Sequence, residues 1–329
     1  MNFRFLFHFL KKENPILKTI SGLKRHRAFT TSRFDLYLPT IHPDHLIVLL
    51  GQMHTVFSGS ISNRERKKIV ACQTRLVEFY EYFYTVHGIS SFGSEGMYEG
   101  FSGADDLRSF KLYQGVMKTL KLEKPSSKEQ LLPVAQQILS ELGRLWQEEL
   151  KSSSDISVLQ NLAMAVSGQT LFDYLHEGNI NSFPIEGERQ YKRVLEGISA
   201  LGKEIERVEN TYEMRVVRQR DGKASNEKET QAVRNYNALV KEFNGVIGSD
   251  IREKATLDIL RERSNNAPMT VFTMGVGHRK NYLKLASEFF GGSNTAFLFI
   301  TPKELLPNWW CILGLPFLAL MLVIGLLFL

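Results

Sequence analysis

Two histidines in this chain stand three residues after a glycine, and each Gly-x-x-His group follows an apolar run. The first group is "GQMH", from Gly51 to His54, directly after Leu46–Leu50. The second is "GVGH", from Gly275 to His278, after "MTVFTM". Neutral imidazole is the commonest general base and metal ligand in proteins. A histidine at the end of a buried strand therefore indicates acid–base or metal chemistry, and a hydrogen-bonded loop residue is the alternative.

Acidic residues follow two other short segments of small or apolar residues. Glu95 lies in "SFGSEG" and Glu186 lies in "FPIEGE", whereas Glu99 and Glu188 are second choices on a turn and in a first helical turn. Two histidines and two glutamates from four separate segments can converge on one site. Such a set can activate water by acid–base catalysis or hold a divalent metal such as Zn, Mn, Fe or Co.

The elements that must position these residues are short strands alternating with helices. Strand–helix–strand patterns predict a mostly parallel central sheet flanked by helices, which is the α/β class. In open sheets of this class, ligands bind beyond the carboxyl ends of the strands. A glycine at that point lets the backbone turn or approach a ligand closely. We expect strands at 45–50, 86–95, 269–277 and 295–300, a helix between the first two, and a helix at 279–290.

The remaining sequence divides into a lead-in, a domain and a tail. Residues 1–43 are basic and irregular, and residues 44–301 are predicted to form the α/β domain. A polar, helical insertion is expected within that domain, at about 102–180 and 188–262. Its charge-rich helices are expected to present a solvated face. We expect helices at 127–150, 156–176, 188–217 and about 249–264, and an exposed loop at 218–229.

The composition excludes several classes of protein. The hydrophobic fraction of 43% and charged fraction of 23% are typical of a globular chain. A net charge of +6, without Lys/Arg runs interleaved with aromatic residues, argues against a nucleic-acid partner. The two cysteines, Cys72 and Cys311, form neither a disulfide framework nor a zinc-binding pattern.

The C-terminal segment 308–329 has the composition of a transmembrane helix. Trp309–Leu329 contains no charged residue, and Trp309 and Trp310 suit a membrane interface. A buried core helix is the alternative. The N-terminal "MNFRFLFHFL" resembles a surface segment more than a cleaved signal peptide. We therefore expect a single-pass, tail-anchored membrane protein with a cytoplasmic domain, and Gly314 permits pairing of its helix in a homo-oligomer.

Five short motifs, in order, resemble the TraB/PrgY–TIKI superfamily, which is related to erythromycin-esterase-like and ChaN-like proteins. The similarity covers about residues 44–300. Three departures are Pro184, where a glycine commonly stands, Glu253, where Asn or Asp is usual, and the long polar middle of the chain. The matching segments are "GQMH" (51–54), "GSEG" (93–96), "IEGERQ" (185–190), "RE" (252–253) and "GVGH" (275–278).

The resemblance implies a site and two kinds of chemistry. Arg252 would orient a carboxylate or bind substrate, beside the backbone at Gly51 and Gly275. TIKI-like relatives are metal-dependent membrane peptidases, whereas esterase-like relatives use a histidine base without a required metal. The resemblance implies that four residues line the catalytic site: His54, Glu95, Glu186 and His278. The same four are candidate ligands for a divalent metal (Mn, Co or Zn).

Three functional hypotheses follow from these patterns. The first is a membrane-anchored hydrolase in which water attacks a peptide or small ester carbonyl. The second is a non-catalytic binding or regulatory protein on the same fold, sequestering a signalling peptide or haem, with Tyr98 or Tyr113 available as a haem ligand. The third is a membrane scaffold that recruits partners through the charged helices at 188–217 and 249–264.

Overall fold

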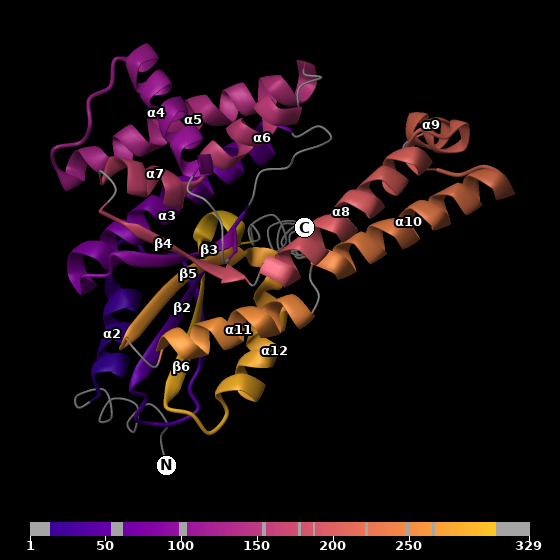
Figure 1. The fold of residues 1–329 in the computed structure, drawn as a ribbon. Coiled ribbons are helices and arrows are strands. Elements are labelled where there is room, and N and C mark those ends of the chain that lie inside the picture. Colours follow the sequence, from indigo (N-terminus) through magenta and orange to yellow (C-terminus); the bar gives the residue numbers. More distant parts are fainter. Residues whose placement is uncertain are drawn as a thin grey trace, which may run out of the picture.

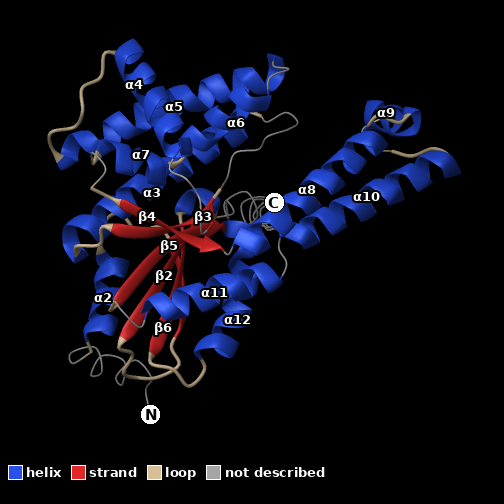
Figure 2. Ribbon diagram, in the orientation of Figure 1, coloured by secondary structure: helices blue, strands red, loops and turns tan. Residues whose placement is uncertain are grey.

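A six-stranded sheet runs through the middle of the α/β domain in the computed structural model (Figure 2). The described residues are 14–53, 62–98, 104–152, 156–176, 179–186, 188–220, 223–247, 250–264 and 267–306. In spatial order, the strands are β1 (Arg33–Tyr37), β6 (Thr295–Thr301), β2 (His45–Gln52), β5 (Met269–Gly275), β3 (Ser91–Tyr98) and β4 (Asn181–Glu186).

Every neighbouring pair of strands is parallel except β1 and β6, so the predicted mostly parallel α/β class is confirmed. The central strand β2 is apolar at every position from Leu46 to Leu50. Leu46, Val48 and Leu50 enter the core on one face of the sheet, and Ile47 and Leu49 enter the core on the other. A strand covered by helices on both faces must be apolar at successive positions.

Helices cover both faces of the sheet (Figure 1). On one face lie α2 (Pro15–Arg25) and α3 (Asn63–His87), and a layer of further helices packs on α3. On the other face lie α11 (Asp250–Ser264) and α12 (Arg279–Phe290). The layer on α3 contains α4 (Ala104–Leu120), α5 (Lys128–Ser152), α6 (Ile156–Ala165) and α7 (Gly168–Leu175).

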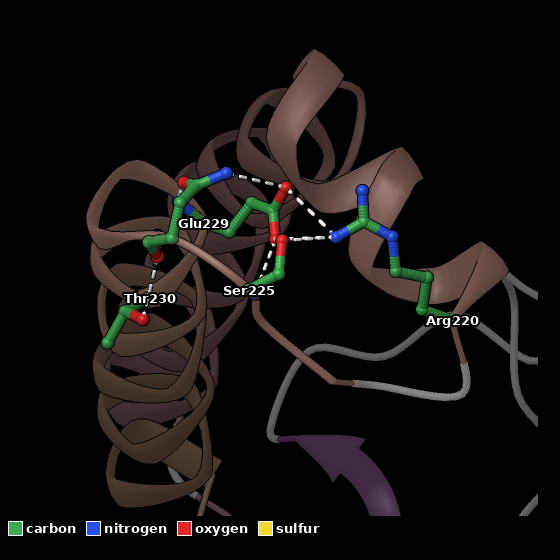
Figure 3. A network of polar contacts seen from close by, with 5 residues as sticks. Arg220, Ser225, Glu229 and Thr230 are labelled. Atoms are coloured by element: carbon green, nitrogen blue, oxygen red, sulfur yellow. Dashed lines mark hydrogen bonds and ion pairs between the residues drawn. The ribbon is translucent and has the colours of Figure 1, made fainter.

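The helices α8 (Glu188–Glu209) and α10 (Glu227–Ile247) form an antiparallel arm that projects from the sheet (Figure 1). The short helix α9 (Tyr212–Gln219) lies at the far end of this arm. A polar network caps the start of α10 there (Figure 3). The buried carboxylate of Glu229 accepts hydrogen bonds from Ser225, Asn226 and Arg220. In return, the N–H of Glu229 donates to Oδ1 of Asn226, so this reciprocal capping satisfies an N–H that helix formation leaves without a partner.

The sequence suggested that the N-terminal lead-in is irregular over its whole length. The structure instead shows a helix and a strand within it. Asn14 caps α2, which buries Ile16, Ile20 and Leu23 against the sheet. Farther on, β1 forms the antiparallel edge strand beside β6. The apolar residues of α2 recur at helical spacing, and this local pattern outweighs the basic composition of the segment.

Several element boundaries also differ from the sequence-based expectation. The second strand begins at Ser91 because α3 continues to His87 and ends at Gly88, whose φ of 66° suits glycine. The helix expected at 156–176 is two helices, because Ser167 caps a new one. The predicted loop at 218–229 ends where α10 begins at Glu227, and that helix was not predicted.

The helix α11 belongs to the layer that covers the sheet and not to a solvated insertion. Glu253, Thr256, Leu257 and Leu260 are all fully buried, at the i, i+3, i+4, i+7 spacing of one helix face. The sequence-based assignment placed this helix in the insertion because charged residues dominate its composition. Its inward face nevertheless has the period that burial requires.

The expected membrane segment, residues 308–329, lies outside the described residues. Among the helices that the structure describes, none combines the length and apolar composition needed to cross a bilayer.

The thiol of Cys72 provides a probe of the folded core. Burial in α3 raises the pKa of this thiol to about 12, so almost no reactive thiolate is present at neutral pH. In a Cys311→Ser background, we expect native Cys72 to react with a water-soluble disulfide reagent at least about 10³-fold more slowly than in denaturant. Fast reaction under native conditions would contradict the burial of this helix face.

Candidate active site

The carboxyl ends of the parallel strands meet at one edge of the sheet. β2 ends at Gln52, β5 ends at Gly275, and β3 and β4 end beside them. A 3₁₀ turn, η1 (Val276–His278), continues from β5 and leads directly into α12. The second Gly-x-x-His group therefore changes the direction of the chain at this edge, where open α/β sheets place their ligands.

The side chain of Glu95 is fixed just beyond Ser94, where the pairing of β3 with β5 ends. The pairing of β3 with β4 shifts register between Ser94 and Tyr98, so the backbone is irregular where Glu95 emerges. Such irregularities commonly redirect a side chain beside a functional site. The N–H of Gly275 donates a hydrogen bond of 2.6 Å to Glu95 Oε2, and the Glu95 side chain is only 8% exposed. Glu95 is therefore held against the turn that carries the histidine.

The imidazole of His278 lies between two carboxylates. Its Nδ1 is 2.7 Å from Oε1 of Glu253, and its Nε2 is 3.6 Å from Oε1 of Glu95. The His278 side chain is 6% exposed and that of Glu253 is fully buried. Because a carboxylate accepts hydrogen bonds, the Nδ1 proton is assigned toward Glu253, and Nε2 then faces Glu95. This order, carboxylate–imidazole–carboxylate, is the central feature of the site.

Glu253 is positioned by its own helix, α11, and by the neighbouring helix α12. It lies on the inward face of α11, and Asn281 of α12 donates a hydrogen bond of 3.2 Å to its Oε1. Its other oxygen, Oε2, is buried and has no hydrogen-bond partner among the described residues. A buried carboxylate is costly without partners, so the contacts from His278 and Asn281 stabilise it.

A second polar network supports the strand ends from the opposite face of the sheet. Gln169 accepts hydrogen bonds from Tyr80 and Thr273, and its amide donates to Ser182, so it joins α3, α7, β4 and β5. Burial raises the pKa of the Tyr80 phenol, which therefore stays protonated as a donor. Gln73 of α3 similarly donates to the carbonyl of Met53, just after β2. These contacts fix the strand ends at the edge that contains Glu95.

The structure brings together two of the four predicted catalytic residues, Glu95 and His278. His54 lies outside the described residues. Glu186 is the last residue of β4 and Arg252 lies in α11, but the side chains of both are outside the described part. Within the described residues, no group of three or more His, Cys, Asp or Glu side chains is arranged to hold a metal. The four-residue metal site therefore stays a prediction.

The two glycines named with this site have different surroundings. Gly51 lies within β2, and a Cβ there would come within 2.9 Å of the Phe299 ring, so glycine makes room for packing against β6. Gly275 ends β5 and provides the N–H that holds Glu95. The packing in the sheet interior therefore explains the glycine at position 51. At position 275, any residue except proline could supply the N–H that holds Glu95.

Known proteins do not identify this chain. No family model matches it. No curated protein and no solved structure matches it either.

The sequence reasoning missed two residues of the site, Glu253 and Asn281. Glu253 was noted only as the residue after Arg252, where the resembling family usually has Asn or Asp. The spacing of Glu253 with Leu257 and Leu260 contained the signal, because it places the acid on the apolar face of its helix. An acidic residue on such a face needs a buried partner, and a histidine in a neighbouring element is a natural choice.

Loss of the Glu253 carboxylate should destabilise the domain. In Glu253→Ala, the His278 ring and Asn281 lose their buried acceptor, and we expect a loss of about 2–4 kcal/mol in the free energy of unfolding. Urea unfolding of the full chain in detergent, followed by circular dichroism, measures this loss. The matched control is Glu288→Ala on the exposed face of α12, for which we expect a change below about 0.5 kcal/mol. Equal losses of stability in the two variants would contradict a structural role for the Glu253–His278 contact.

Proposed function

We propose that this protein is a membrane-anchored hydrolase of the TraB/TIKI type that directs water at a peptide or small ester carbonyl. The observation that supports this most is the buried row Glu95–His278–Glu253 at the carboxyl edge of the sheet. An imidazole oriented by a carboxylate is the arrangement that activates a nucleophile in many unrelated hydrolases.

In the proposed mechanism, His278 is the general base. Glu253 holds Nδ1–H, so the lone pair of Nε2 is directed toward the site. Nε2 takes a proton from water as the water oxygen attacks the substrate carbonyl. The same proton then passes to the leaving group as the tetrahedral intermediate collapses. Asn281 assists indirectly, because it fixes Glu253.

Glu95 has a complementary role in this mechanism. Its Oε2 is held by the N–H of Gly275, while its Oε1 stays 3.6 Å from Nε2, beyond direct hydrogen-bond distance. A water molecule that lies beside this pair can contact both atoms. Glu95 can therefore orient the attacking water and stabilise the imidazolium that forms.

The residues present are also compatible with a divalent metal, although its ligand set extends beyond the described residues. His278 Nε2 and Glu95 Oε1 face each other, and Glu253 contacts the opposite ring nitrogen, as is usual for a metal-bound histidine. His54 and Glu186 would complete the set. A bound Mn, Co or Zn ion would supply Lewis acidity and a more acidic water.

The proposal includes the C-terminal membrane anchor. Residues 308–329 have the length and composition of one transmembrane helix, and the α/β domain would then lie on the cytoplasmic side. Its substrate and its oligomeric state are part of the same proposal: a peptide or small ester, with Gly314 in the face through which two copies of the anchor would pair.

Substitution of His278 should abolish turnover without unfolding the chain. Against a panel of fluorogenic peptides and small esters, we expect His278→Ala to lower the rate by about 10²- to 10⁴-fold. The matched control is His45→Ala, because His45 lies at the opposite end of β2, where its ring Nδ1 is 3.1 Å from the carbonyl oxygen of Ala267. Wild-type binding of a substrate without any turnover across the panel would instead favour the binding or regulatory role.

The metal content of the protein distinguishes metal-dependent hydrolysis from catalysis by a histidine base without a metal. Elemental analysis of the detergent-purified full chain should find about one divalent metal per chain if a ligand set exists, and less in His278→Ala and His54→Ala. An unchanged, near-zero content after incubation with Mn, Co and Zn, together with retained turnover, would leave histidine-base catalysis. Metal that persists in both variants would contradict a site shared by these histidines.

A further inference from the structure

The first three turns of α3 present a stripe of cations to solvent. Arg64, Lys67 and Lys68 are exposed, as is Ala71, and these positions share one helix face that continues to Arg75. The opposite face of the same turns is buried, with Ile69 and Val70 in the core. The three cations and Ala71 are named the basic face of α3.

Among described residues, no carboxylate neutralises the basic face. Among the residues that the structure describes, none forms an ion pair with Arg64, Lys67 or Lys68. The nearby acid Glu65 accepts hydrogen bonds from the backbone and hydroxyl of Ser62 in the capping box of the helix. The face therefore keeps a local positive charge.

The chain leaves the domain beside this face. After β6, the turn η2 (Lys303–Leu305) packs on α3, and Arg75 donates to Oε1 of Glu304 at 3.3 Å through both Nε and Nη2. Arg75 lies on the same helix face as Arg64, roughly 16 Å along the axis. Lys303 is exposed at this point and adds a further cation.

The apolar C-terminal segment begins almost immediately afterwards. Only Pro307 and Asn308 separate Leu306 from Trp309, the first residue of the uncharged run. A chain of three residues reaches at most roughly 10 Å. If Trp309 lies at a membrane interface, the surface that surrounds Leu306 must therefore lie close to the lipid headgroups.

We propose that the basic face of α3 docks on an anionic bilayer surface. This inference rests on the proposed membrane anchor and specifies how the domain is oriented on it. Cations near an anionic leaflet are attracted by about 1 kcal/mol each, and the short tether keeps them at a high effective concentration. Charge complementarity and the position of the chain exit both favour lipid over a protein partner.

The docked orientation would bring the candidate site to the membrane. Because β6 is parallel to β2 and β5, the chain exits at the same sheet edge that contains Glu95 and His278. A site at that edge is suited to a peptide or ester that is itself held at the lipid surface. A soluble substrate would reach it less readily in the docked state.

The test measures how well lipid protects residue 71 in the full chain. Ala71→Cys is introduced with Cys311→Ser, since buried Cys72 does not compete for reagent. The chain is reconstituted into vesicles of phosphatidylcholine alone or mixed with phosphatidylserine, and labelled with a neutral polyethylene-glycol maleimide. We expect slower labelling on the mixed vesicles, and we expect high salt to reverse it. The docked-to-undocked ratio should fall about fivefold for each cation removed.

The decisive comparison uses two triple variants with the same change in net charge. Arg64→Glu/Lys67→Glu/Lys68→Glu should label equally fast on both lipids. Lys111→Glu/Lys118→Glu/Lys121→Glu, at exposed positions on and just after α4, should keep the protection. Equal labelling of the Ala71→Cys/Cys311→Ser chain on both lipids would overturn docking. Failure of this chain to float with vesicles would overturn both the membrane anchor and the docking. Neither result depends on turnover, so a failed hydrolase assay is distinguishable from failed docking.

Discussion

The fully buried carboxylate of Glu253 constrains much of this domain. A carboxylate without water needs hydrogen-bond donors, and His278 and Asn281 supply them from the start of the next helix. The contact fixes α11 against α12 and thereby fixes the turn after β5. That turn presents the N–H of Gly275, which holds Glu95 on a third element. A single buried charge thus aligns the consecutive elements α11, β5 and α12 with β3, which is distant in sequence.

The two faces of the sheet support the carboxyl edge in different ways. On the α3 face, neutral amides and hydroxyls around Gln169 join the strands. On the α12 face, the ionisable residues Glu95, His278 and Glu253 meet. This separation keeps reactive chemistry on one side of the edge, while the rigidity that positions it comes from both sides.

Periodicity and strand-end glycines were enough to predict the parallel sheet, because β2, β5 and β6 are apolar at successive positions. The same reasoning selected Glu95 and His278, since strand order in a parallel sheet brings carboxyl ends together. It failed for Glu253 because an acid in a charged helix looks solvated unless its spacing to Leu257 and Leu260 is weighed first. It also failed for β1, whose pairing with β6 depends on a contact that local sequence cannot specify.

The position of β2 in the sheet has a consequence for biosynthesis. Both neighbours of β2 are late strands: Leu46 pairs with Met269 on one side and with Ala296 on the other. While the ribosome makes the intervening residues, β2 has two open hydrogen-bonding edges and an unbroken apolar run from Leu46 to Leu50. Such a strand is prone to aggregation, and non-local pairing is slow to form. The nascent chain must therefore keep this strand shielded, by its own α3 or by a chaperone, until translation is nearly complete.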